Sequence, residues 1–170
     1  NVVGTGIRPQ SRVDREVLGV SESKAAKFQK KAERAWKIWL PFSDAGNRMD
    51  FYEIQQLVDR QILENGEAII IPIMIRDKNR PYSLALQVIE ADRLATPPEK
   101  RGDKTIRAGV RIGENGEPVS YFIQKMHPGD YRYSKADDRK FVEIPARNEY
   151  GRANVFHLYP VQRSGQTRGV

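Results

Sequence analysis

Two stretches near the N-terminus repeat apolar residues at helical spacing. The first runs from about Glu22 to Leu40 and ends before Pro41, which cannot continue a helix. Ser21 or Ser23 is placed to cap its start. The predicted buried face carries Phe28, Ala32, Ala35, Trp36 and Trp39. The opposite face carries Lys27, Lys30, Arg34 and Lys37. The pattern therefore predicts an amphipathic helix whose second face is basic and solvated.

The second helical stretch has clear signals at both ends. Asp50 is placed as an N-cap, and Glu53 follows three residues later, as in a capping box. Met49 and Ile54 are spaced for a hydrophobic staple across that turn. The predicted buried stripe consists of Ile54, Leu57, Val58 and Ile62. Asn65-Gly66 then predicts the end of the helix, because glycine accepts a left-handed backbone.

After the second helix the apolar pattern becomes that of β-strands. The predicted strands cover residues 67–75, 82–89, 106–112, 119–126, 141–144 and 154–159. Pro72 indicates a bulge or an edge in the first of them, since proline cannot donate to a ladder. Gly113–Gly116 predicts a hairpin turn, and residues 119–124 alternate between two faces. Two N-terminal helices followed by strands predict an α+β fold with a mainly antiparallel sheet.

Composition narrows the classes of protein to consider. A chain of 170 residues fits one domain, or one domain with an appended piece, and its 29 basic and 22 acidic residues give a net charge of +7. This charge suits a polyanionic partner or simply a solvated surface. The absence of cysteine excludes disulfides, thiolate nucleophiles and zinc sites built on cysteine. The longest apolar run, Ala68–Ile75, is far shorter than the roughly 18 residues of a membrane span.

Few residues suggest catalysis. His127 precedes Pro128-Gly129 and is expected in a turn, whereas His157 lies in a predicted strand and is expected to be packed or at the surface. Carboxylates at strand ends could hold Mg²⁺ for phosphodiester cleavage, and the three in question are Glu67, Glu90 and Asp92. The alternative is that these charges pair with Arg76 or Arg93. We predict no catalytic, cofactor-binding or metal-binding residue and no cofactor.

Several segments together resemble the N-terminal part of lambda-type bacteriophage portal proteins. They are the opening Asn1–Pro9, the tryptophan pair Trp36 and Trp39, Ser43–Gly46, Leu57–Glu67, Ile89–Leu94 followed by Pro97, Val155–Tyr159, and Arg163–Gly169. The last is the most specific, because its arginines, glycines and glutamine follow at a fixed spacing. The family often has cysteine where this chain has Ser43.

The resemblance implies a structural role. It suggests the wing-like region of a portal subunit, one wedge of a ring, usually of twelve copies, that conducts DNA at a capsid vertex and connects head to tail. The chain then divides into an irregular arm at 1–20, with one edge strand at most, an α+β wing domain at 21–161, and a tail at 162–170 leading toward a stem helix. Both ends look cut, as expected for a piece of a longer protein, and the resemblance implies that stem and clip regions lie elsewhere in the parent protein.

The resemblance also implies partners and a location. The partners are other portal subunits, terminase, capsid and head–tail proteins, and double-stranded DNA bound without sequence preference. The location is the virion, or the host bacterial cytoplasm during assembly or as a prophage product. The residues expected to contact nucleic acid or a neighbouring subunit are Lys27, Lys30, Arg34, Lys37, Arg163 and Arg168. Two other functions stay open: a stand-alone basic nucleic-acid-binding domain and a metal-dependent nuclease.

Overall fold

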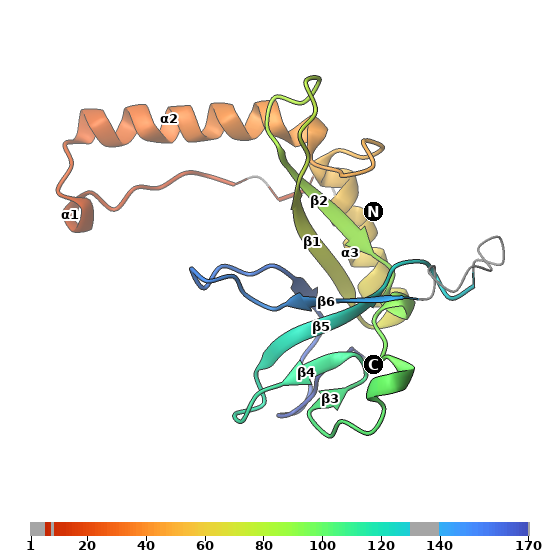
Figure 1. The fold of residues 1–170 in the computed structure, drawn as a ribbon. Coiled ribbons are helices and arrows are strands. Elements are labelled where there is room, and N and C mark those ends of the chain that lie inside the picture. The colour runs from red at the N-terminus through yellow and green to blue at the C-terminus, as the bar shows by residue number, and fades with distance from the viewer. Residues whose placement is uncertain (1–5, 8, 130–139, 170) are drawn as a thin grey trace. The chain divides into compact units, whose positions relative to one another are not determined.

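Helices come first along the chain and antiparallel strands follow, in a computed structural model that describes residues 6–7, 9–129 and 140–169 (Figure 1). The helices are α1 (Arg15–Leu18), α2 (Glu22–Trp39) and α3 (Phe51–Asn65), with 3-10 turns at Leu40–Phe42, Ala91–Arg93 and Pro98–Lys100. The strands are β1 (Ala68–Met74), β2 (Leu84–Ile89), β3 (Ile106–Arg107), β4 (Val110–Ile112), β5 (Pro118–Gln124), β6 (Phe141–Pro145) and β7 (Phe156–Leu158). The predicted α+β class is confirmed. Among the described residues of the arm, the structure has the short α1 and no strand.

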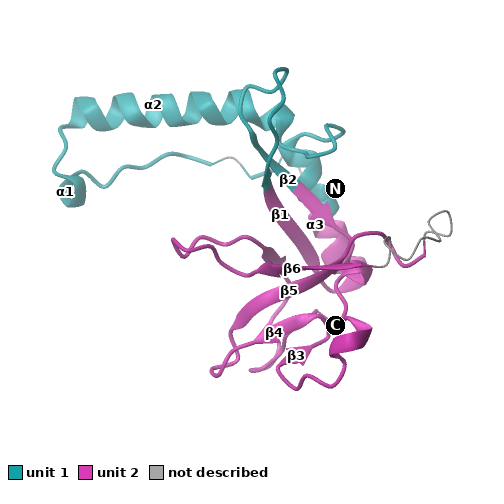
Figure 2. Ribbon diagram, viewed as in Figure 1, with its two compact units in different colours: residues 1–57, 73–86 teal, residues 58–72, 87–170 magenta. Residues whose placement is uncertain are grey.

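The chain forms two compact units (Figure 2). One unit contains residues 1–57 and 73–86, and the other contains residues 58–72 and 87–170. This division by contacts differs from the three segments predicted from the sequence, which remain a prediction about domain organisation.

The predicted helix ends are confirmed. The Ser21 hydroxyl accepts a hydrogen bond from the Lys24 amide and caps α2. Asp50 accepts the amides of Tyr52 and Glu53 at 2.8 and 2.9 Å, and the Glu53 carboxylate accepts the Asp50 amide at 2.8 Å. This reciprocal pair is the predicted capping box. Gly66 follows α3 with a φ of 76°, so it supplies the left-handed residue expected there.

The buried face predicted for α2 is only partly correct. Trp39 is buried, and its indole nitrogen donates to the Leu84 carbonyl at 2.7 Å. Trp36 and Phe51 pack edge to face with ring centroids 4.7 Å apart. Phe28, in contrast, is 61% exposed. The aromatic partners of α2 lie at its C-terminal end, so apolar periodicity alone overestimates the burial of Phe28.

The loop between α2 and α3 pairs with β2 within the same unit. Asp44 forms a parallel bridge with Leu86, and the Leu86 amide donates to the Ser43 carbonyl at 2.7 Å. Ser43 is fully buried, and its hydroxyl donates to the Leu40 carbonyl at 2.9 Å. Arg80 donates to the carbonyls of Phe42 and Asp44. These bonds satisfy the backbone of an irregular segment that is partly withdrawn from water.

The strands form two sheets. One has the order β2-β1-β7 and the other the order β3-β4-β5-β6, in which every pair is antiparallel. The pairing of β1 with β7 ends at Ile70. Pro72 lies beyond this pairing, so its missing N–H removes no hydrogen bond between β1 and β7. In β5, residues Ser120–Ile123 are buried in succession. Both faces of β5 are therefore covered, and its alternation does not separate core from solvent.

The predicted strand over 106–112 is wrong, because it is a hairpin. β3 and β4 are joined by Ala108 and Gly109, whose φ angles are 46° and 88°. Two consecutive positive φ angles are the mark of a tight two-residue hairpin turn. A Cβ on Gly109 would lie 2.7 Å from the Ala95 nitrogen, so this position also requires glycine for space. The predicted turn at Gly113–Gly116 is confirmed between β4 and β5.

Candidate functional site

A buried carboxylate lies between α3 and β1 in the second unit. Glu67 directly follows Gly66, and its side chain is only 2% exposed. A charged group withdrawn from water is stable only when it is paired and hydrogen-bonded. The partners of Glu67 therefore identify the segments that the fold brings to this point.

Arg168 is the main partner of Glu67. Its guanidinium binds carboxylate oxygen Oε1 through both Nε, at 2.7 Å, and Nη2. The remaining N–H groups donate to backbone carbonyls. Nη1 donates to the carbonyls of Leu94 and Ala108 at 2.6 and 3.0 Å, and Nη2 donates to the carbonyl of Ala91 at 3.1 Å. All five N–H donors of the guanidinium are thus used. Arg168 holds the end of the described chain against three separate segments: Glu67, the turn at Ala91–Leu94, and Ala108.

The second oxygen of Glu67 is also occupied. Its Oε2 lies 2.9 Å from His157 Nε2 and accepts the Gly169 amide at 2.9 Å. His157 stands opposite Ile69 in the β1–β7 pairing, which explains how it reaches Glu67. A Cβ on Gly169 would overlap the Gly66 carbonyl and lie 2.8 Å from the Glu67 Cβ. Only glycine fits at 169, because the two backbones approach so closely.

Electrostatics keep this carboxylate ionised. Burial by itself raises the pKa of Glu67, but hydrogen bonds from His157, Arg168 and Gly169, with the Arg168 charge, lower the pKa to about 2. Burial raises the pKa of Tyr121 to about 12, and burial together with the Glu67 charge raises the pKa of Tyr159. The rings of both tyrosines pack against His157, with centroids 5.6 and 4.6 Å away.

The segment before Arg168 is an ordered loop. Gln166 organises it: its side chain accepts the Gln162 amide at 2.8 Å and donates to the carbonyls of Arg168 at 2.7 Å and Pro160 at 3.3 Å. Tyr159 donates to the Gln166 carbonyl at 3.0 Å. The loop predicted for 162–170 is therefore confirmed over its described residues, and it is held in place by side-chain hydrogen bonds.

The structure does not bring the three carboxylates considered for Mg²⁺ together. Glu67 is saturated by Arg168, His157 and Gly169, so the expected pairing with Arg76 or Arg93 is wrong for this residue. The Asp92 side chain is 77% exposed, and its Oδ2 lies 3.6 Å from His127 Nε2. Within residues 6–7, 9–129 and 140–169, no group of three or more His, Asp or Glu side chains is arranged to hold a metal ion. The same residues include no helix both long and apolar enough to cross a membrane.

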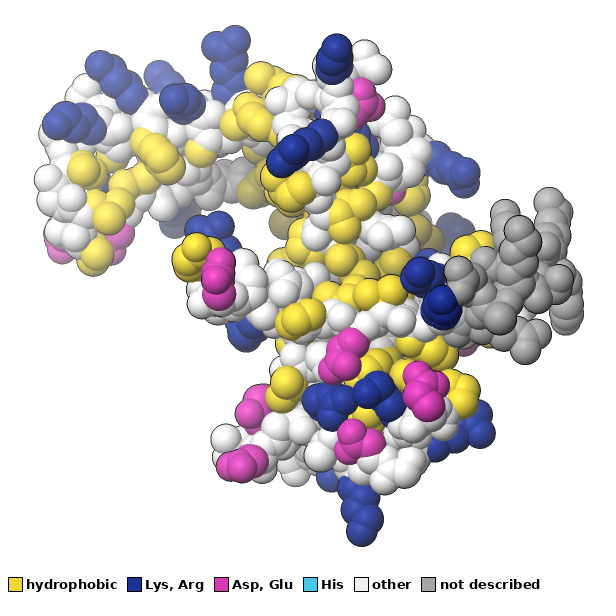
Figure 3. Space-filling view, in the orientation of Figure 1, with side chains coloured by type: hydrophobic (Ala, Val, Ile, Leu, Met, Phe, Trp, Pro, Cys, Tyr) yellow, Lys and Arg dark blue, Asp and Glu magenta, His cyan; other side chains and the backbone are white. Residues whose placement is uncertain are grey.

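The six predicted contact residues have different surroundings. Lys27, Lys30, Arg34 and Lys37 are exposed on α2, where basic side chains are prominent in Figure 3. Arg163 is exposed in the C-terminal loop, whereas Arg168 is committed to Glu67. These contacts stay predictions, and the structure adds an intramolecular role for Arg168.

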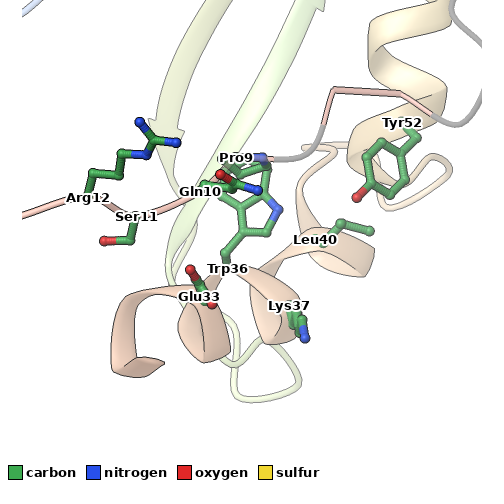
Figure 4. Close-up of a pocket in the computed structure, with 9 residues that line it drawn as sticks. All are labelled: Pro9, Gln10, Ser11, Arg12, Glu33, Trp36, Lys37, Leu40 and Tyr52. Carbon is green, nitrogen blue, oxygen red and sulfur yellow. The ribbon is translucent and has the colours of Figure 1, made fainter. Parts of the chain in front are cut away.

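A hollow of about 520 Å³ lies in the first unit between the N-terminal arm and α2 (Figure 4). The indole of Trp36 faces it beside Pro9 and Gln10, with Leu40 and Tyr52 further along. The Trp36 indole nitrogen is buried and has no acceptor among the described residues. The sequence pattern places Trp36 on the buried face of the helix, and the structure shows that it also lines this hollow.

Sequence reasoning did not connect Glu67 with Arg168, which are 101 residues apart. A signal was nevertheless present. Gly66-Glu67 and Arg168-Gly169 both belong to segments singled out for their resemblance, and each pairs a glycine with a charged residue. Together they form one close backbone crossing, in which Gly169 provides space, Gly66 supplies a left-handed backbone and the two charges form the ion pair.

Comparisons with known proteins agree with one another. A family model described as "Phage portal protein, lambda family" matches residues 1–170. The chain is similar to portal protein B of Escherichia phage lambda, with 25% identity, and to the portal protein of Escherichia phage N15, with 22% identity. Each alignment covers 100% of this chain and 32% of the relative. A probable portal protein of Halomonas phage phiHAP-1 is 30% identical over 61% of this chain and 20% of its own length. The chain thus spans about a third of the length of these two Escherichia phage portal proteins.

Proposed function

The chain belongs to the lambda family of phage portal proteins, and from this premise we propose that it is the wing-like region of a subunit of the portal ring. In this role it is a structural wedge at one capsid vertex, beside the conduit through which DNA is packaged and ejected and at which head and tail connect. The family match over the whole chain is the observation that carries the proposal.

The candidate site supports a structural role. Both oxygens of Glu67 and all five donors of Arg168 are bound within the chain. A carboxylate saturated in this way, with a pKa of about 2, is a poor general base and has no free lone pair directed at a substrate. The cluster attaches the C-terminal loop to Glu67, directly before β1, and it is not a reactive centre.

The proposed partners follow from the ring. A closed ring requires one surface of each subunit to contact a different surface of the next. The exposed basic face of α2, with Lys27, Lys30, Arg34 and Lys37, serves as such a surface or contacts DNA phosphates without reading sequence. In the whole protein, terminase, capsid and head–tail proteins bind the assembled ring. Its location is the virion, after assembly in the host cytoplasm or as a prophage product.

The test is assembly of the parent protein. We expect the full-length product of the gene to form closed rings, usually of twelve subunits, visible by electron microscopy and with a matching mass by native mass spectrometry. A parent protein that stays monomeric at all concentrations, or that cleaves DNA with Mg²⁺, would contradict the proposal. Alanine at Glu90 or Asp92 is the control for cleavage, since a metal-dependent nuclease loses activity on losing a ligand.

A further inference from the structure

The C-terminal loop borders a second hollow, of about 550 Å³, in the second unit. Its lining consists of Arg107 at the end of β3, Ala108, and residues 163–169. No acidic residue lines it. We call this feature the arginine hollow. The ionisable side chains in its lining are all arginines: Arg107, Arg163 and Arg168.

Two of the three arginines have no counter-charge. Arg168 is neutralised by Glu67, but Arg107 and Arg163 are exposed and form no ion pair within the described part of the chain. Elsewhere in the same unit an arginine between strands is paired, as Arg111 is with Asp103 and Glu143 at 3.0 and 3.2 Å. The arginine hollow therefore carries two uncompensated positive charges, and planar guanidinium groups match the oxygens of a phosphate.

The backbone of the loop adds hydrogen-bond donors. The Gln166 amide donates to the Arg163 carbonyl at 3.3 Å and closes a turn in which Gly165 has a φ of 76°. The amides of Ser164, Gly165 and Thr167 donate to no acceptor in the described residues, and the hydroxyls of Ser164 and Thr167 are equally free. Loops that alternate between right- and left-handed residues present such amides to anions.

The loop is also held by hydrogen bonds within the chain. Gln166, Tyr159 and the Glu67–Arg168 pair fix its backbone from both sides. Donors that are already held in place lose little conformational entropy when a ligand binds. More of the charge attraction therefore remains as binding free energy. We propose that the arginine hollow binds a phosphate group through Arg107 and Arg163, with the loop amides and hydroxyls as additional donors. That the phosphate belongs to the DNA backbone rests on the proposed function, whereas the affinity for phosphate itself does not.

The test uses the full-length parent protein and the double variant Arg107→Gln/Arg163→Gln. The matched control is Arg101→Gln, which removes an exposed arginine of the same unit that does not line the hollow. Two probes are used: inorganic phosphate, compared with chloride at equal ionic strength, and a short fluorescent DNA duplex. Thermal unfolding reports phosphate binding, and fluorescence anisotropy over a salt series reports DNA binding.

We expect phosphate to raise the melting temperature of the wild type and the control but not of the double variant. We also expect the double variant to bind DNA about tenfold more weakly at low salt, with a plot of log K against log salt flatter by about 0.9 for one lost phosphate contact. A phosphate effect without a DNA effect supports the hollow and rejects DNA as the source. Equal behaviour of the double variant and Arg101→Gln with both probes overturns the proposal. Ring assembly of the same variants is followed by electron microscopy, so a failure of the ring is distinguishable from a failure of the hollow.

Discussion

At the scale of single residues, the ion pair of Glu67 and Arg168 holds the end of the described chain. The Glu67 side chain is 2% exposed and the Arg168 side chain is 24% exposed. Water can therefore solvate the guanidinium in part, whereas the carboxylate needs the guanidinium to stabilise its charge. Removing one member of a buried pair is far more damaging than replacing both, because the remaining charge stays desolvated.

We therefore expect Arg168→Ala to lower the free energy of unfolding by about 3–5 kcal/mol. The measurement is urea unfolding followed by circular dichroism. Arg163→Ala is the matched control, since this exposed arginine has no ion pair in the described residues and is expected to change stability by less than about 0.5 kcal/mol. The double variant Glu67→Gln/Arg168→Met should be more stable than Arg168→Ala. Equal stability of Arg168→Ala and Arg163→Ala would contradict a fastening role for the pair.

The same pair makes stability depend on pH. The pKa of Glu67 is lowered from 4.5 to about 2, so the folded state holds the proton more weakly than the unfolded chain. The contribution of the ionised Glu67 carboxylate to the stability of the folded state is fully present above pH 4.5. It is lost as the pH falls from 4.5 toward 2. The shift corresponds to about 3 kcal/mol. We expect the difference in unfolding free energy between wild type and Glu67→Gln to shrink across this range, and a difference independent of pH would refute the assignment.

The distance along the chain explains why the sequence did not predict this pair. Capping at Asp50 depends on neighbours within one helical turn, so it could be predicted and is confirmed. The bond between Glu67 and Arg168 depends on the tertiary path of the backbone. Residue chemistry alone offered Arg76 and Arg93 as equally good partners.

At the scale of elements, the main error concerns β3 and β4. Ala108 has a positive φ, which alanine rarely adopts, so the sequence Ala108-Gly109 carried no strong turn signal. The exposure of Phe28 is a similar case, because periodicity shows which face of α2 is apolar but not how much of the helix has a neighbour. Helix existence, helix ends and the Gly113–Gly116 turn were predictable from local signals.

Two glycines allow the β3–β4 turn to be tested with an internal control. Gly109 and Gly116 have φ angles of 88° and 82°, but a Cβ on Gly109 meets Ala95 and one on Gly116 meets nothing within 4 Å. Gly116→Ala should cost about 1–2 kcal/mol of unfolding free energy for the backbone conformation alone. We expect Gly109→Ala to cost more, because the Ala95 backbone must also move. Equal costs in urea unfolding would mean that the close approach of Gly109 to Ala95 is not significant in solution.

At the scale of the whole molecule, charge is distributed unevenly along the chain. Helix α2 contains six lysines and arginines and two glutamates, a balance of +4 out of the total of +7. An exposed basic helix of this kind suits either a neighbouring subunit or DNA phosphate. A single copy offers only a few such contacts, whereas a ring repeats them around one axis and engages many phosphates together.

This repetition yields a prediction that separates a ring subunit from a stand-alone DNA-binding domain. We expect the assembled parent protein to bind duplex DNA at least about 100-fold more tightly than residues 1–170 alone, with a steeper dependence on salt, because more phosphates are neutralised per complex. Fluorescence anisotropy over a salt series measures both. Lys27→Gln/Lys30→Gln/Arg34→Gln/Lys37→Gln tests whether α2 contributes, since glutamine keeps helix propensity and removes the charge. If residues 1–170 bind DNA as tightly as the ring does, and this variant abolishes binding, the chain acts as an independent nucleic-acid-binding domain.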